Sequence, residues 1–159
     1  MKNPFEFSCD NKRYHTLSYH NKQTFNVKIF KAVIDAGFTC PNKDGSKGIG
    51  GCIFCDGGSG YFTNSYLKSV EEQIKMELKR IKKKNPNARA IAYFQANTNT
   101  YADVQKLKKI YLPVLSQPDV EGISIGTRAD CLQPQILDFL EELSHKTYLT
   151  VELGMQTIH

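Results

Sequence analysis

The chain has 159 residues, of which 40% are hydrophobic and 23% charged, and a formal net charge of +5. This composition is typical of one folded globular unit with a buried core, and it excludes an intrinsically disordered chain. The sequence contains no apolar run long enough to span a membrane and no apolar signal-peptide core near its N-terminus, so we expect neither membrane insertion nor secretion. Five cysteines in such a chain indicate reduced thiols and metal binding rather than disulfides, which predicts a cytoplasmic protein.

Residues 1–27 are polar and aromatic without a clean period, and we interpret them as an N-terminal extension with one short helix. The following segment, VKIFKAVIDAG, is rich in β-branched and aromatic residues from Lys28 onward. It ends in Ala36-Gly37, which predicts a strand followed by a turn.

A glycine-rich loop between Asp35 and Gly58 contains three of the five cysteines. Cys52 and Cys55 form a CxxC pair, whose spacing lets both sulfurs face one centre, and eleven residues separate Cys40 from Cys52. A closed structural zinc site or an ordinary iron–sulfur cluster usually takes four protein ligands. The loop therefore predicts a metal site with one coordination position left open. A dithiol oxidoreductase that used only the CxxC pair would leave Cys40 unexplained.

The rest of the chain alternates helix and strand patterns. Ser69 and Glu72 have capping-box spacing, which predicts a helix that runs to about Lys84 and stops before Pro86. Further helices are predicted at 102–115 and 134–144, and further strands at 89–95, 120–126 and 148–153. The residues expected to face the core are Val70, Ile74, Leu78 and Ile81, then Leu107, Ile110 and Tyr111, then Ile136, Leu137, Leu140 and Leu143.

Four strands separated by three helices predict an α/β fold of repeated βαβ units, with about four parallel strands and three crossover helices. In such folds the carboxyl ends of the strands meet at one edge, where active sites lie. Polar residues follow each predicted strand and should gather at that edge. They are Cys40, Cys52 and Cys55, then Asn97 to Thr100, then Thr127 to Asp130, then Glu152 and Gln156.

Four stretches in combination resemble the radical S-adenosylmethionine (SAM) superfamily: DAGFTCPNKDGSKGIGGCIFC, YFQANTNTY, SIGTRADCL and VELGMQT. They are most similar to the YhcC-like group, which is related to the Elongator catalytic-subunit radical SAM domain. The long spacing after Cys40 departs from the commonest superfamily spacing and resembles this group's longer loop. The resemblance implies the N-terminal portion of a partial (β/α)6 TIM-like barrel, so that residues 28–159 would be an incomplete core domain.

The resemblance also implies a [4Fe–4S] cluster on Cys40, Cys52 and Cys55, with SAM bound to the remaining iron. A reductant such as flavodoxin or ferredoxin would supply an electron, and SAM would be cleaved to a 5′-deoxyadenosyl radical that takes hydrogen from a substrate. Kinship with a tRNA-modifying domain makes tRNA a candidate substrate. By the same resemblance, the residues expected to bind the cofactor are Phe54, Asn97, Thr98, Asn99, Thr127, Arg128, Glu152 and Gln156. Gly126 stands where relatives often have a glutamate.

Several of these residues also have a structural interpretation. Arg128 and Asp130 can pair with each other and cap the following helix, and Glu152 can be the ion-pair partner of a basic residue. Cys131 is expected to be a small buried packing residue, as free cysteines usually are.

A function of a different class is a zinc-binding module. It would use the three loop cysteines and a fourth ligand from Cys9, Cys131, His15 or His20. The basic run from Lys75 to Lys84 would then be a nucleic-acid-binding face, although such a run is most often a solvated helix face.

Overall fold

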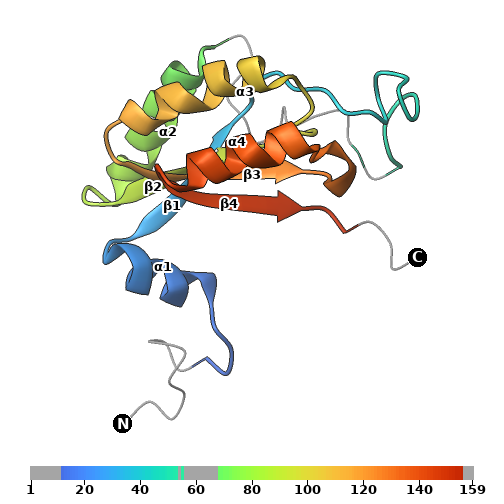
Figure 1. Ribbon diagram of the computed structural model, residues 1–159. Helices are drawn as coiled ribbons and strands as arrows, with labels where there is room; N and C mark the ends of the chain where they lie inside the picture. The colour runs from blue at the N-terminus through green and yellow to red at the C-terminus, as the bar shows by residue number, and fades with distance from the viewer. Residues whose placement is uncertain (1–11, 54, 56–67, 156–159) are drawn as a thin grey trace.

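The computed structural model describes residues 12–53, 55 and 68–155. In this part of the chain, three crossover helices lie together on one face of a four-stranded sheet (Figure 1). Phe54 and Gln156, expected to bind the cofactor, lie outside the described residues, as does Cys9.

The sheet is entirely parallel, with the strands in sequence order. Its strands are β1 (Ile29–Ile34), β2 (Arg89–Phe94), β3 (Val120–Thr127) and β4 (Tyr148–Leu153). This pairing confirms the predicted α/β fold with parallel strands. The strands form from apolar runs that helices separate in the sequence.

The strands are connected by α2 (Val70–Lys84), α3 (Val104–Tyr111) and α4 (Pro134–Ser144). The capping box of α2 is confirmed: the Glu72 N–H donates to Ser69 Oγ at 3.2 Å, and the Ser69 N–H donates to Glu72 Oε2 at 2.9 Å. None of the helices in the described ranges has the length and apolar character that crossing a bilayer requires.

The α-helix of the second crossover, α3, is shorter than the predicted helix at 102–115. It ends at Tyr111 and continues as the 3-10 helix η1 (Leu112–Ser116). Pro113 explains the change, because proline has no N–H to donate to the preceding turn of an α-helix.

The core fills the space between the sheet and these helices, and Tyr111 lies at its centre. The Tyr111 ring is fully buried and packs edge-on against Phe94, with ring centroids 4.7 Å apart. Its hydroxyl donates to the carbonyl of Asn99 at 2.6 Å, so this buried phenol is satisfied by the backbone of the loop after β2.

The buried stripe of α4 differs from the prediction in one residue. Ile136, Phe139, Leu140 and Leu143 are buried, whereas Leu137 is 49% exposed. The prediction that Leu137 faces the core was wrong, because it lies about 100° around the helix from Ile136.

The short helix expected in the N-terminal extension is α1 (Leu17–Phe25). The Phe25 ring packs edge-on against Tyr148 with centroids 5.0 Å apart, and His20 Nε2 lies 2.8 Å from the Tyr148 hydroxyl oxygen. These contacts attach α1 to the start of β4. Figure 1 shows that α1 lies away from the crossover helices.

Gly122 allows a direct test of the pairing between β3 and β4. A Cβ atom at Gly122 would lie 2.4 Å from the carbonyl oxygen of Tyr148, a contact between the backbones of paired strands that only a shift of one strand relieves. We expect Gly122→Ala to lower the free energy of unfolding by about 2 kcal/mol, measured by urea denaturation. The control is Gly126→Ala, whose Cβ would meet the Phe94 carbonyl oxygen at 3.4 Å and should cost less. Equal losses in the two variants would contradict the pairing.

Candidate functional site

The loops after β1, β2 and β3 meet at the carboxyl edge of the sheet. The Thr98 N–H donates to the Thr39 carbonyl at 3.1 Å, which links the first loop to the second. The Asn99 N–H donates to the Gly126 carbonyl at 3.1 Å, which links the second to the third strand's end. The structure thus brings together the polar groups expected after the first three strands.

A buried amide fixes the start of the cysteine loop, the segment from Asp35 onward. Gln73 on α2 is 0% exposed and bonds both backbone groups of Asp35. Its Oε1 accepts from the Asp35 N–H at 2.9 Å, and its Nε2 donates to the carbonyls of Asp35 at 2.8 Å and Lys68 at 3.0 Å. Because an unpaired buried amide is costly, this set of bonds holds the end of β1 against the start of α2.

The cysteine loop folds back on itself between Cys40 and Cys52. The Lys43 N–H donates to the Cys40 carbonyl at 2.8 Å, and the Gly51 N–H donates to the Asn42 carbonyl at 2.9 Å. Gly51 has a φ of 91°, a conformation that glycine adopts without steric cost. The closure returns the chain at Cys52 to the turn that begins at Cys40.

The three loop cysteines are free and half-buried. Asn42 Nδ2 donates to Cys52 Sγ at 3.1 Å, which ties Cys52 to the residue two positions after Cys40. The Cys55 N–H donates to the Cys52 carbonyl at 2.8 Å and so forms the turn of the CxxC pair. Within the described ranges, no three side chains of His, Cys, Asp or Glu are close enough together to hold a metal ion.

The surroundings of Cys40 favour its thiolate. Burial by itself raises the pKa of the Cys40 thiol, but hydrogen bonds with the Thr98 side chain and the Asn42 backbone, together with the charge of Arg128, outweigh burial. The net effect is a pKa below the ordinary value for cysteine. The thiolate is the form that binds metals, so this environment suits a metal ligand.

Cys131 has the opposite environment. It is 5% exposed, and burial followed by the nearby charge of Asp130 raises the pKa of its thiol. The prediction that Cys131 is buried is confirmed.

Three contacts between side chains hold the cysteine loop against the loops after β2 and β3. They join Lys43 Nζ to Asn97 Oδ1 at 2.7 Å, Ser46 Oγ to the Tyr101 hydroxyl at 2.7 Å, and Lys47 Nζ to Asp130 Oδ2 at 2.5 Å. A cavity of about 500 Å³ lies beside these contacts, with Lys47, Tyr101, Asp103, Asp130 and Gln133 among its lining residues.

Asp130 binds two cations from different loops. Arg128 Nε and Nη2 donate to its two oxygens at 2.9 and 2.7 Å, and Lys47 approaches from the cysteine loop. The hydrogen bonds from Arg128 and Lys47 hold the pKa of Asp130 well below its usual range. The expected pair of Arg128 and Asp130 is confirmed, whereas α4 has no side-chain cap. Arg128 Nη1 also lies 3.9 Å from Cys40 Sγ.

The asparagines after β2 are engaged by protein atoms. Asn97 Nδ2 donates to the Phe38 carbonyl at 2.9 Å, and Asn99 Nδ2 donates to the carbonyls of Ala96 and Gly126, each at 2.9 Å. Their side chains therefore support the loop itself. Their contact with SAM stays a prediction.

The threonines expected at the site lie behind the loops rather than on the surface. Thr98 and Thr127 are 1% and 6% exposed. Thr127 Oγ1 lies 2.6 Å from Thr100 Oγ1, which also donates to the Cys131 carbonyl at 2.8 Å. This buried pair joins the loops after β2 and β3. The contacts of Thr98 and Thr127 with SAM stay predictions.

Glu152 accepts hydrogen bonds from one polar side chain on each of the other three strands. This network lies on the sheet face away from the crossover helices. Its Oε1 accepts from Lys31 Nζ at 2.6 Å and Ser124 Oγ at 3.0 Å, and its Oε2 accepts from the Tyr93 hydroxyl at 3.0 Å. Burial alone raises the pKa of Glu152, but bonds with Lys31, Ser124 and Tyr93 bring it below the ordinary value. The interpretation of Glu152 as an ion-pair partner is confirmed, with Lys31 as the base.

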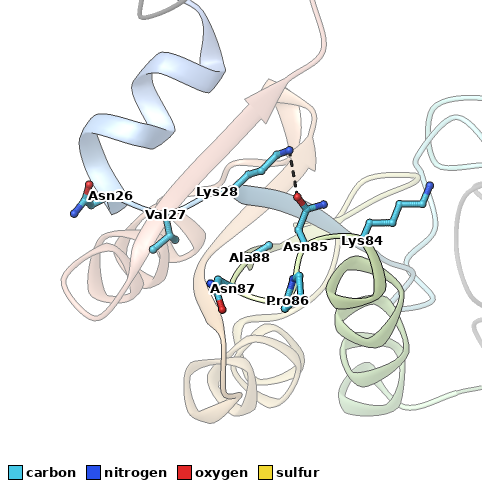
Figure 2. A pocket seen from close by; sticks show the side chains of 8 residues that line it. All are labelled: Asn26, Val27, Lys28, Lys84, Asn85, Pro86, Asn87 and Ala88. Carbon is cyan, nitrogen blue, oxygen red and sulfur yellow. Dashed lines mark hydrogen bonds between the residues drawn. The ribbon is translucent and has the colours of Figure 1, made fainter.

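The basic run of α2 lies toward the opposite, amino edge of the sheet. Arg80 pairs with Glu77, and Lys82 pairs with Asp119, while the remaining lysines of the run are exposed. A pocket of about 390 Å³ lies beyond the end of α2, where Figure 2 shows Lys28 reaching toward Asn85; its Nζ donates to Asn85 Oδ1 at 3.4 Å.

Similar proteins occur in distant organisms. The chain is 48% identical over 160 residues to the uncharacterized protein YtqA of Bacillus subtilis, in a match that covers 100% of this chain and 50% of YtqA. It is 38% identical over 136 residues to the protein YhcC of Escherichia coli K12, covering 85% of this chain and 43% of YhcC. An uncharacterized protein of Methanocaldococcus jannaschii is 41% identical over 142 residues, covering 87% of this chain and 42% of that protein.

The chain spans about half the length of the curated relatives it matches, and their names state no activity. No protein-family profile matches the chain, and no solved structure matches it at a significant level.

Tyr93 provides a pH test of the Glu152 network. Burial, followed by the charge and hydrogen bond of Glu152, raises the pKa of Tyr93 to about 12. Because the folded pKa exceeds the unfolded value of about 10, the protonated phenol adds stability below pH 10 that is lost as the pH rises toward 12. Between pH 10 and pH 12, we therefore expect the free energy of unfolding to fall less in Tyr93→Phe than in the wild type.

Ultraviolet difference spectra of the wild type against Tyr93→Phe would report the titration of this phenol alone. Glu152→Gln should shift the titration to lower pH, because it removes the negative charge that opposes the phenolate. A Tyr93 that titrates at the ordinary value for tyrosine in the folded protein would contradict the network.

Proposed function

We propose that this chain provides the cluster-binding and SAM-binding part of a radical SAM enzyme, with its sheet as the N-terminal part of a partial (β/α)6 barrel. The observation that carries the proposal is the closure of the cysteine loop at the carboxyl edge of a parallel sheet. That closure sets the thiolate-favouring Cys40 beside the CxxC segment.

The chemistry of the donor set fits a [4Fe–4S] cluster, because three thiols on one loop are ligands of the kind that such clusters take, although the three side chains do not lie close enough together in this structure to hold a metal ion. Cys40, Cys52 and Cys55 are free, half-buried thiols on a loop that bonds tie to both neighbouring loops. The hydrogen bond from Asn42 to Cys52 Sγ is of the kind that tunes iron–sulfur clusters. Cys40, Cys52 and Cys55 would hold the cluster, and SAM would bind beside it. When bound, the cluster and SAM supply one-electron chemistry that produces a hydrogen-abstracting radical.

The chain's own residues orient the cofactors and exclude water. Thr98 and Thr100 are nearly fully buried beneath the edge, and the buried phenol of Tyr111 supports Asn99 from below. The resulting platform has few ways to move, which is what a site that controls a reactive radical requires.

The sheet face with Glu152 would line the interior of the proposed barrel. Lys31, Tyr93 and Ser124 hold the carboxylate in one orientation, so it can accept a hydrogen bond from a ligand at little entropic cost. A protein of the flavodoxin or ferredoxin class would act as reductant. For the candidate tRNA substrate, the exposed lysines Lys75, Lys79 and Lys83 of α2 could neutralise phosphates.

Anaerobic reconstitution with iron and sulfide tests the cluster. We expect the complete natural protein that carries this sequence to bind about four irons per chain with a brown chromophore. Alanine at Cys40, Cys52 or Cys55 should abolish cluster binding, whereas Cys131→Ala, which removes a buried thiol with a raised pKa, should retain it. Stoichiometric zinc without a chromophore would contradict the proposal and support the zinc-binding module.

Cleavage of SAM tests the activity. With dithionite as reductant, the reconstituted protein should release 5′-deoxyadenosine from SAM, detected by mass spectrometry, and addition of tRNA should raise the yield if tRNA is the substrate. A four-iron protein that binds SAM and never cleaves it would refute the proposed reaction.

A further inference from the structure

We propose that Arg128 raises the reduction potential of the cluster bound at Cys40, and that Asp130 and Lys47 are positioning residues that fix the Arg128 guanidinium beside the Cys40 sulfur. The inference rests on the proposed function, because it concerns the same cluster.

The guanidinium is held in a defined orientation. Its Nε and Nη2 donate to the two oxygens of Asp130 at 2.9 and 2.7 Å. A guanidinium is planar and rigid, so fixing this edge also fixes the direction of Nη1. Nη1 lies 3.9 Å from Cys40 Sγ.

Lys47 connects this pair to the cysteine loop. Its Nζ lies 2.5 Å from Asp130 Oδ2, and its backbone N–H donates to the carbonyl of Pro41, the residue after Cys40, at 2.8 Å. Cys40, Arg128, Asp130 and Lys47 therefore form a closed ring of contacts. A displacement of the loop away from Arg128 would have to break one of these contacts.

The three charged groups leave one net positive charge, and the member nearest the sulfur is the cation. A surface ion pair alone contributes little stability. Arg128 and Asp130 side chains are only 26% and 35% exposed, however, so solvent screens the guanidinium incompletely.

Reduction adds one electron to the cluster and removes one from the external reductant, without a proton. The reduced cluster carries one more negative charge than the oxidised cluster, and a fixed cation stabilises the more negative form. The potential of an iron–sulfur cluster depends on local charge and on hydrogen bonds to its sulfurs. Arg128 should therefore favour reduction and raise the reduction potential of the cluster.

A redox titration of the reconstituted complete protein, followed by electron paramagnetic resonance of the reduced cluster, measures the effect. We expect Arg128→Met to decrease the equilibrium constant of one-electron reduction roughly tenfold, which is a fall of about 59 mV in midpoint potential. Arg128→Lys should give a smaller fall, because it keeps the charge and loses the two-pronged contact with Asp130.

The matched control is Arg89→Met. Arg89 also pairs with an acid, Glu121, but it lies at the start of β2, at the amino edge of the sheet. Its loss changes the net charge equally and should leave the potential unchanged. Equal falls in Arg89→Met and Arg128→Met would overturn the inference, because the effect would then come from overall charge.

The remaining outcomes separate the inference from the proposed function. A wild-type protein without a cluster signal refutes the proposed function. A cluster with the same potential in wild type and Arg128→Met refutes only the inference. If Arg128→Met does not retain a cluster, Arg128→Gln is measured by the same criterion. Loss of the cluster in both neutral variants would assign Arg128 to cluster assembly and overturn the electrostatic role.

Discussion

The parallel pairing of the four strands is the constraint on which the rest of the structure depends. Parallel strands require crossover connections, and those crossovers return the chain to the same edge each time. Cys40, Asn97 and Arg128 are far apart in sequence, yet each follows the carboxyl end of its strand. The parallel topology alone places these three residues at the same edge, without any contribution from side-chain contacts.

Polar contacts then convert this proximity into a fixed arrangement. The backbone bond from Asn99 to Gly126 and the buried Thr100–Thr127 pair join the loops after β2 and β3. The Tyr111 hydroxyl supports the same segment from the core. Buried polar groups must find partners, so a loop whose donors and acceptors are satisfied in one conformation is held in it. The more exposed cysteine loop is attached to this platform.

The sequence was sufficient for the elements and their order, because local patterns determine them. The capping box at Ser69 and the apolar run at β2 each depend on residues close in the chain. The tie between Gln73 and Asp35 was missed, because it joins residues 38 positions apart and Gln73 looks like an ordinary polar position on an amphipathic helix. At the site, the cysteines were readable from their spacing, whereas the contacts of Lys43, Ser46 and Lys47 depend on how the loop folds back.

Strand alternation in the sequence is enough to indicate part of the Glu152 network. Lys31 and Tyr93 interrupt apolar runs in β1 and β2, and alternation places both on the face opposite the buried alanines Ala32 and Ala92. Gly126 is the register partner of Glu152. Under the resemblance to radical SAM proteins, Gly126 occupies a position where relatives often have a glutamate. Glu152 therefore supplies a carboxylate on the strand next to that position, and three donors hold it in place. Under the proposed function, this carboxylate would contact a ligand on this face of the sheet.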